Sequence, residues 1–174
     1  LPSNPKAKCV DLGCGSGLLL FYLKDTGYRD ICGVDISAEQ VQIAKQVTRN
    51  VLREDVGEFV QRHHDAFDLI TAIDVIEHLS KEEALDFLHG CQQALKVNGR
   101  LIIQTPNAAS PRVAAVYYGD LTHETCFHPE LLKRLMTQGF RSIEVREQCP
   151  IPVNYSLKSS LRYGLWSFIR LLMQ

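Results

Sequence analysis

The sequence lacks any apolar run that approaches the roughly 20 residues of a membrane-spanning helix. It also lacks an excess of either charge, because 19 Lys and Arg stand against 20 Asp and Glu. Without a net positive field to draw it onto phosphate-rich surfaces, we expect no nucleic-acid partner. The chain shows no signal peptide, internal repeat or low-complexity tract, so we expect one soluble, cytoplasmic globular domain.

Cysteine pairs with metal-binding or redox spacing are also missing. None of the cysteines forms a CxxC pair, and several lie in apolar, strand-like segments. This pattern indicates reduced thiols rather than a disulfide or zinc framework. The six cysteines are Cys9, Cys14, Cys32, Cys91, Cys126 and Cys149.

Strand-like and helix-like segments alternate along the chain, which predicts an α/β domain with a parallel sheet. The predicted strands are 8–12, 30–35, 50–54, 67–73, 100–105 and 140–147. The predicted helices are 16–27, 37–47, a segment from Ser80 to a stop at Asn98–Gly99, and 129–139. Ser37 with Gln40 and Ser80 with Glu83 match the capping-box pattern. We expect a core domain over 1–150 and a helical extension over 151–174.

A glycine-rich loop, in the stretch CVDLGCGSG, directly follows the first predicted strand. Its spacing differs from the dinucleotide fingerprint, whose third glycine would fall at Leu18, and no P-loop Gly-Lys follows. A carboxylate at Asp11 would repel a diphosphate but attract an ammonium or sulfonium. S-adenosylmethionine carries both cations and therefore fits this loop. The loop glycines are Gly13, Gly15 and Gly17.

A second acidic residue, Asp35, ends the next predicted strand, 18 residues after Gly17. A carboxylate at that strand end can accept two hydrogen bonds from ribose hydroxyls. The alternative is an ordinary acidic residue before a helix. The spacing favours the ribose interpretation.

Four segments in order resemble the motifs of class I S-adenosylmethionine-dependent methyltransferases: VDLGCGSG, GVDIS, FDLITAIDVIEHL and LKVNGRLIIQTPN. DVIEHL followed by TPN is similar to the branch with ubiquinone-biosynthesis O-methyltransferases and sugar or polysaccharide-cluster methyltransferases. The resemblance implies a Rossmann-like, doubly wound, mostly parallel sheet. The family's N-terminal helices and seventh strand have no counterpart here. Because the chain also starts without Met, we expect a fragment of a longer protein.

The resemblance also implies how the cofactor is held. The implied cofactor-binding residues are, in chain order, Asp11, Gly13, Gly15, Gly17, Asp35, Ile36, Asp55, Val56, Ile73 and Asp74. The first four would face the methionine moiety, and the next two would lie at the ribose. Asp55 would accept from the adenine amine and Val56 would offer its backbone N–H. The last two would line the methyl-transfer site.

Methyl transfer to a hydroxyl benefits from a base, and histidine is the natural candidate. His78 follows the fourth predicted strand, and His123 lies in the loop after the fifth. Both are at the sheet edge where open α/β folds bind ligands. We predict these two as the catalytic histidines. The others are expected in polar loops, on a helix surface or at a helix N-cap: His63, His64, His89 and His128.

A divalent ion offers a second interpretation of the same segment. The set Asp74, Glu77, His78 and His123 loosely resembles the metal site of small-RNA 2′-O-methyltransferases. Such an ion would bind a substrate diol and lower its pKa. Alternatively, Glu77 and His78 cap a helix and hydrogen-bond locally. Local capping and hydrogen bonding are favoured because no basic surface supports RNA binding, so no metal is expected.

The segment 106–128 is too long for a simple connection and is predicted to contact the methyl acceptor. It carries many hydrogen-bonding and ring side chains: Asn107, Arg112, Tyr117, Tyr118, Asp120, His123 and Glu124. We therefore expect a methyltransferase acting on a hydroxyl of a small molecule or glycan. The open alternatives are an N- or C-methyltransferase, a metal-assisted RNA 2′-O-methyltransferase and a non-catalytic module.

The C-terminal segment has apolar residues at helical spacing between Leu157 and Leu172, with Lys158, Arg162 and Arg170 beside them. A basic amphipathic helix of this kind can lie on a membrane surface. The favoured interpretation is a helix that packs on the domain, covers the substrate or forms a dimer surface. The sequence does not determine the oligomeric state.

Overall fold

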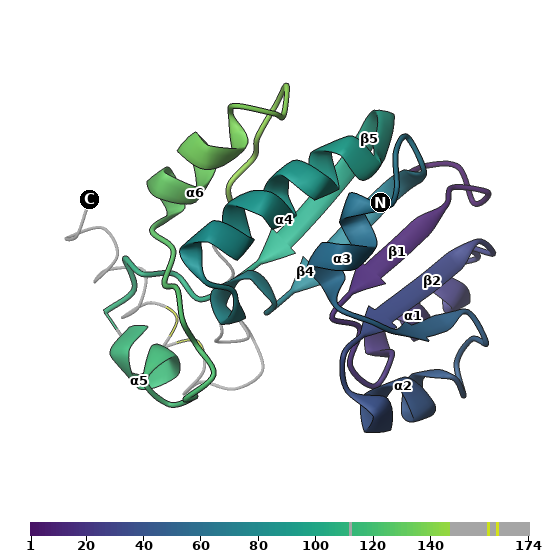
Figure 1. Cartoon of the computed structure of the whole chain (residues 1–174), viewed down its shortest axis with the longest axis horizontal. Coiled ribbons are helices and arrows are strands. Elements are labelled where there is room, and N and C mark those ends of the chain that lie inside the picture. The colour runs from purple at the N-terminus through teal and green to yellow at the C-terminus, as the bar shows by residue number, and fades with distance from the viewer. Residues whose placement is uncertain (112, 147–159, 161–162, 164–174) are drawn as a thin grey trace. The chain divides into compact units, whose positions relative to one another are not determined.

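The computed structural model describes residues 1–111, 113–146, 160 and 163. The amino-terminal elements are β1 (Cys9–Leu12), α1 (Leu18–Asp25), β2 (Ile31–Asp35), α2 (Ala38–Ala44), β3 (Val51–Arg53) and α3 (Val56–Gln61). They are followed by β4 (Phe67–Ile73), η1 (Ile76–His78), α4 (Lys81–Ala94), β5 (Leu95–Gln104), α5 (Val113–Tyr117) and α6 (Pro129–Met136). This alternation confirms the predicted α/β class (Figure 1).

The five strands form one sheet in the order β3-β2-β1-β4-β5, and every neighbouring pair is parallel. The chain winds outward from β1 to β3 and then returns to the other side of β1 at β4. This reversal creates a crevice at the carboxyl ends of β1 and β4, where open α/β sheets bind ligands. The Rossmann-like class I methyltransferase architecture is therefore confirmed.

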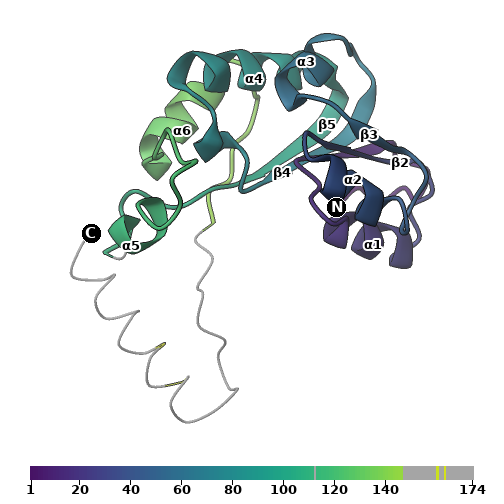
Figure 2. The same ribbon diagram turned by 60° about the horizontal axis from the view of Figure 1, so that its bottom comes forward.

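Helices cover both faces of the sheet, with α1 and α2 on one side and α3, α4 and α6 on the other (Figure 2). Each face has its own apolar core. Leu20, Leu23 and Val41 belong to the first core, and Phe59 and Phe87 belong to the second. Because β1 is buried on both faces, its residues read as a continuous apolar run interrupted only by Asp11.

Helix starts follow the predicted capping chemistry in part, because the predicted box at Ser37 is only half formed and the N–H of Ser37 donates to Asp35 instead. The side chain of Ser37 accepts from the N–H of Gln40 at the start of α2. Ser80 and Glu83 form a complete capping box at α4. His128 directly precedes Pro129, the first residue of α6. Its Nδ1 accepts from the N–H of Glu130, as expected for an N-cap.

One predicted boundary and one predicted strand are wrong. The helix that begins after Ser80 ends at Ala94 rather than at Asn98–Gly99, because Leu95 already pairs with Phe67 in the sheet. The pairing of β4 with β5 then shifts register between Phe67 and Leu69. In this part of β5, Asn98 has a φ of 65°. The predicted sixth strand is also wrong, because no ladder forms over the described residues 140–146.

The chain divides into two units, Leu1–Ile143 and Glu144–Gln174, and the described part of the second is limited to 144–146, Ser160 and Tyr163. Most of the predicted extension over 151–174 lies outside the described residues, although Ser160 and Tyr163 are helical. Among the described residues, no helix combines the length and apolar character needed to cross a membrane. The five cysteines in the described part are free thiols, whereas Cys149 lies outside it.

The close packing of α3 on α4 depends on Gly90. A Cβ added there would lie 2.6 Å from Cγ2 of the fully buried Val60. Glycine-to-alanine changes in free helices stabilise by about 1 kcal/mol, but we expect Gly90→Ala to destabilise by about 1–3 kcal/mol through overpacking. Urea unfolding measures the change. In a Val60→Ala background the same substitution should stabilise, and a stabilising effect in both backgrounds would contradict this packing.

Candidate functional site

The glycine loop after β1 lies against the segment that follows β4. Gly13 has a φ of 68°, a conformation that favours glycine, and an added Cβ would collide with Cγ2 of Val75. The N–H groups of Gly13 and Cys14 both donate to the carbonyl of Val34 in β2. The loop is therefore fixed at the switch point between β1 and β4, as predicted for a ligand-binding turn.

Asp35 connects two backbone segments at the end of β2. Its Oδ2 accepts from the N–H of Gly15 at 2.8 Å, and its Oδ1 accepts from the N–H of Ser37 at 2.8 Å. Each carboxylate oxygen has a further lone pair for a ligand hydroxyl. The predicted ribose contact stays a prediction, but Asp35 has a structural role that the sequence analysis did not assign.

Asp11 is almost completely buried, with 3% of its surface exposed. Its Oδ1 accepts from the hydroxyl of Thr71 at 2.7 Å. Burial, reinforced by the nearby charge of Asp35 and opposed by the Thr71 hydrogen bond, raises the pKa of this carboxyl to about 6. In the described part of the chain no salt bridge involves it, so a bound cation would find a charge without a partner.

The predicted nucleoside side of the site lies beyond β2 and β3. Ile36 is 68% exposed, which leaves an apolar surface beside Asp35 that a nucleoside can cover. The Oδ1 of Asp55 accepts from the N–H of Glu58 and caps α3, and Val56 is the first residue of that helix. The predicted contacts of these residues with adenine stay predictions.

The strand end of β4 carries the last two predicted cofactor residues. Ile73 is half-buried at the end of β4, and Asp74 follows at a φ of 53°. Nε2 of Gln104 donates to both carboxylate oxygens of Asp74 at 3.4 Å. A left-handed conformation at a non-glycine residue is uncommon, and here it turns the chain from β4 toward η1.

The first predicted catalytic histidine, His78, ends η1 and contacts the long loop after β5. Its Nδ1 lies 3.2 Å from the carbonyl and 2.9 Å from the hydroxyl of Thr122. That hydroxyl donates to Oδ1 of Asp120 at 2.6 Å. Sequence reasoning missed Thr122, although an Asp two residues before a Thr is a typical Asx-turn signal.

The second predicted catalytic histidine, His123, lies beside the first. The two rings are 4.8 Å apart between centroids, and Tyr117 stacks on His123 at 5.6 Å. Nδ1 of His123 lies 3.0 Å from the carbonyl of Tyr117 at the end of α5. The structure thus brings together the two histidines, 45 positions apart, that were selected from the sequence.

Glu77 is buried beneath this pair, with 1% of its surface exposed. Its backbone carbonyl accepts from the N–H groups of Glu124 and Thr125, which fixes the long loop on η1. Its Oε2 has no hydrogen-bond partner among the described residues. Burial raises the pKa of its carboxyl, with the charge of Asp74 acting in the same direction.

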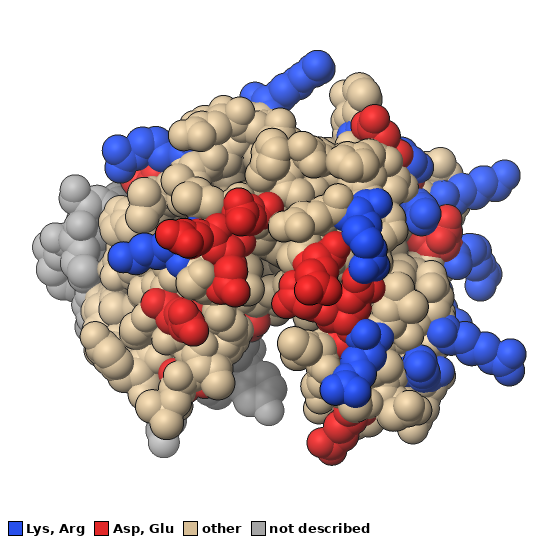
Figure 3. Space-filling view, in the orientation of Figure 1, with Lys and Arg blue, Asp and Glu red and all other residues tan. Residues whose placement is uncertain are grey.

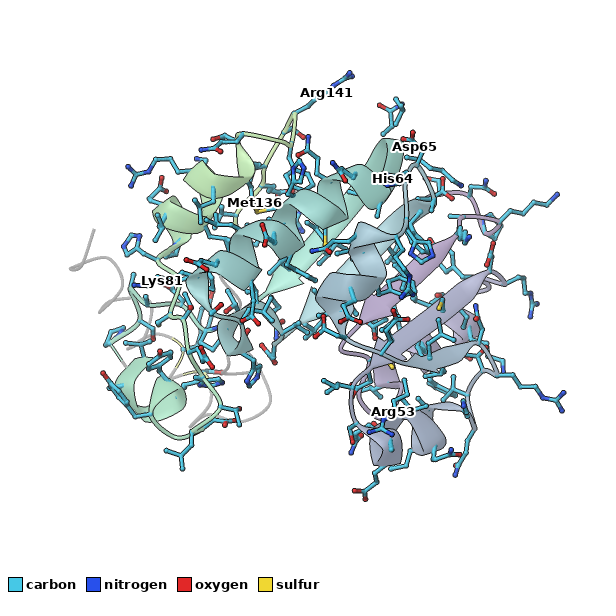
Figure 4. The ribbon with its side chains drawn as sticks, viewed as in Figure 1. Arg53, His64, Asp65, Lys81, Met136 and Arg141 are labelled. Atoms are coloured by element: carbon cyan, nitrogen blue, oxygen red, sulfur yellow. The ribbon has the colours of Figure 1, made fainter. Side chains whose placement is uncertain are left out.

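The remaining histidines lie apart from this site. His64 follows α3 next to Asp65, at the edge where β4 begins, far from Arg53 at the end of β3 (Figure 4). Nδ1 of His63 lies 2.8 Å from the carbonyl of Phe59, and His89 is exposed on α4. Their predicted exclusion from the site agrees with these positions.

The surface at the carboxyl edge of the sheet is hollowed between the α1–α2 side and the α4–α5 side (Figure 3). Asp and Glu side chains gather on both sides of the hollow, and some Lys and Arg stand beside the acidic cluster on the α1–α2 side (Figure 3). This distribution suits a ligand with positive charge better than a polyanion.

These features define the class of the protein. A positive-φ glycine loop at the switch point, a buried Asp11 without a cationic partner and an acidic Asp35 at the end of β2 fit S-adenosylmethionine. The fold is that of class I S-adenosylmethionine-dependent methyltransferases. The family model described as "Methyltransferase domain" matches residues 1–145, so the chain belongs to that family.

Known proteins support the same assignment. The ubiquinone biosynthesis O-methyltransferase of Klebsiella pneumoniae is 27% identical over 106 residues, which cover 58% of this chain and 43% of that protein. A SAM-dependent methyltransferase from Archaeoglobus fulgidus is 28% identical and has a TM-score of 0.77. The match covers 96% of this chain and 79% of that protein's chain. The matched segment therefore spans less than half of the curated relative.

A more distant structure shows the fold with a ligand of this type. The phosphoethanolamine N-methyltransferase 1 of Haemonchus contortus, in complex with phosphoethanolamine and S-adenosylhomocysteine, is 19% identical. It has a TM-score of 0.57 and covers 62% of this chain and 24% of its own. At this identity the likeness concerns the fold alone. The family assignment makes S-adenosylmethionine the cofactor of this domain.

Proposed function

We propose that this chain transfers the methyl group of S-adenosylmethionine to a hydroxyl of a small molecule or glycan. One observation carries the proposal. Val75 packs against the glycine loop at Gly13 and also accepts, through its carbonyl, from the N–H of His78. The segment that carries His78 therefore begins at the glycine loop.

The bound cofactor supplies an electrophilic methyl group on a sulfonium. The proposed role of the chain is to hold and orient the reactants. Asp11 would attract the cationic methionine moiety, and Asp35 would accept from the ribose hydroxyls. Orientation of this kind contributes about 7–11 kcal/mol to lowering a barrier.

The acceptor side of the site suits a hydroxyl-bearing ring. Tyr117 and Tyr118 meet edge to face at 5.2 Å between centroids, and Tyr118 is 79% exposed. Flat aromatic surfaces pack well on sugars and aromatic rings. The matched ubiquinone-biosynthesis relatives are named O-methyltransferases, which supports oxygen as the acceptor atom. The near-zero net charge supports a small acceptor over a nucleic acid.

His123→Ala tests this assignment. We expect kcat to fall by about 10²–10⁴ while the Kd for S-adenosylhomocysteine stays within about twofold, because His123 belongs to the acceptor side. Turnover is measured with labelled cofactor on a panel of sugars, catechols and amines, and binding by calorimetry. His89→Ala, on the outer face of α4, is the matched control.

Two outcomes contradict the proposal. Methylation of amines alone would replace the hydroxyl acceptor by a nitrogen. Loss of S-adenosylhomocysteine binding in His123→Ala would move this residue to the cofactor side of the site.

A further inference from the structure

Three side chains on the proposed acceptor side have metal-ligand atoms close to one another. One donor atom each from Glu77, His78 and His123 lies within 4.8 Å of the donor atoms of the other two. Among the described residues, no hydrogen bond or salt bridge joins these three side chains to one another. They are close enough to share an ion, and the contacts of η1 with the loop after β5 hold them in this arrangement.

The hydrogen bonds of His123 and His78 leave the same ring nitrogen free on both. A carbonyl only accepts, so Nδ1 of His123 carries the proton that it donates to Tyr117. Nδ1 of His78 faces the carbonyl of Thr122 and must also be a donor. The hydroxyl of Thr122 donates to Asp120, so it too accepts from His78. Each neutral imidazole therefore presents an unprotonated Nε2, the usual metal-ligating form.

Glu77 provides an independent observation. A carboxylate with 1% exposure normally has its oxygens hydrogen-bonded. The nearby hydroxyl of Thr105 acts to lower the pKa of the Glu77 carboxyl, yet neither Oε2 of Glu77 nor this hydroxyl has a hydrogen-bond partner of good geometry among the described residues. Its backbone carbonyl accepts from Glu124 and Thr125, so η1 is held against the loop that carries His123. A cation would supply the missing partner.

We propose that Glu77, His78 and His123 bind a divalent transition-metal ion on the acceptor side of the site. Two imidazole nitrogens and one carboxylate oxygen favour Zn²⁺ or a similar first-row ion over Mg²⁺. With bonds of about 2.0–2.2 Å, a tetrahedral ion holds its ligands about 3.4 Å apart, which requires only modest side-chain rotation from a 4.8 Å spacing. Three protein ligands leave a coordination position for the acceptor.

The ion gives the acceptor hydroxyl its nucleophilic form. The coordinated oxygen releases its proton to water because the metal lowers its pKa. An oxygen lone pair then forms the C–O bond to the methyl group as the C–S bond breaks and its electron pair returns to sulfur. The products are the methyl ether and neutral S-adenosylhomocysteine. This role rests on the proposed function, and it makes the histidines metal ligands rather than bases.

Cobalt binding tests the site independently of activity. Metal-free protein is titrated with Co²⁺ alone, and the visible d–d absorption is recorded. We expect saturation at one ion per chain without a near-ultraviolet thiolate band, because the ligands are nitrogen and oxygen. Glu77→Gln, His78→Ala and His123→Ala should each weaken Co²⁺ binding by at least about tenfold. His89→Ala should bind as the unmodified chain does.

Binding of S-adenosylhomocysteine by calorimetry shows that each variant is folded. Thr122→Val, which removes the hydroxyl between His78 and Asp120, should weaken Co²⁺ binding by about 10- to 100-fold. The proposal is overturned if the unmodified chain binds no Co²⁺, or if the three ligand variants bind it unchanged. Co²⁺ binding without methylation of any hydroxyl would instead overturn the proposed function and leave the metal site established.

Discussion

Asp11→Asn is expected to stabilise the ligand-free chain and, at the same time, to weaken cofactor binding. Asp11 is buried and its pKa is raised from 3.8 to about 6. At neutral pH the folded chain therefore holds a charge that burial disfavours, which corresponds to about 3 kcal/mol. Asparagine keeps an oxygen that accepts from Thr71 and removes the charge. We expect a gain of about 1–3 kcal/mol above pH 7.

The stabilisation by Asp11→Asn should depend on pH. Between pH 3.8 and about 6 the folded chain binds more protons at Asp11 than the unfolded chain does. The contribution of Asp11 to stability is therefore complete below pH 3.8 and is lost as the pH rises through about 6. The advantage of Asp11→Asn should vanish near pH 4 and grow toward pH 7. Thermal unfolding across this range measures it, and equal stabilities at every pH would contradict an ionised Asp11.

Cofactor binding should change in the opposite direction. Loss of the charge at Asp11 removes a charged partner for the methionine ammonium, so affinity for S-adenosylmethionine should fall by about 10- to 100-fold. Asp68→Asn is the contrasting control. The pKa of Asp68 is lowered by its hydrogen bonds with Lys96 and Lys8, so this variant should lose stability and keep its cofactor affinity.

Asp35→Ala should lower cofactor affinity by at least about 100-fold, because two charge-assisted hydrogen bonds to ribose would be lost. It should also destabilise the ligand-free chain by about 1–3 kcal/mol, since the N–H groups of Gly15 and Ser37 lose their acceptor. Calorimetry and urea unfolding measure the two effects. Asp35→Asn keeps one oxygen, so both its cofactor affinity and its stability should lie between those of Asp35→Ala and the unmodified chain. Asp25→Ala, exposed on α1, should change neither.

Either half of this result can fail separately. Unchanged affinity with lowered stability would leave Asp35 as a support of the glycine loop alone. Unchanged stability with lowered affinity would show that water replaces the carboxylate at Gly15 and Ser37.

The positions of the residues assigned to the cofactor could be predicted because their signals are local. Gly13 follows one short apolar strand and Asp35 ends the next, and parallel strands bring their carboxyl ends to one edge. The same logic placed His78 and His123 at that edge. Helix α3 was missed although Asp55 and Glu58 carry an N-cap pattern, because six residues show too little periodicity.

The errors and omissions depend on distant contacts. Leu95 continues the apolar stripe of α4 and reads as helical, but its pairing with Phe67 across the sheet takes priority. Segment 140–147 alternates as a strand does, yet a strand forms only where a partner completes its hydrogen bonds. The contact between His78 and Thr122 spans 44 positions, and no local pattern predicts it.

The winding of the sheet has an evolutionary consequence. Residues before β4, from Asp11 to Val56, supply most of the proposed cofactor contacts, whereas η1 and the loop after β5 supply the acceptor side. If this division of roles holds, mutations or insertions in residues 106–128 should alter which molecule is methylated and leave the proposed nucleoside contacts in place. We expect chimeras of homologous genes joined near Phe67 to take most of the proposed cofactor contacts from one parent and the proposed acceptor side from the other.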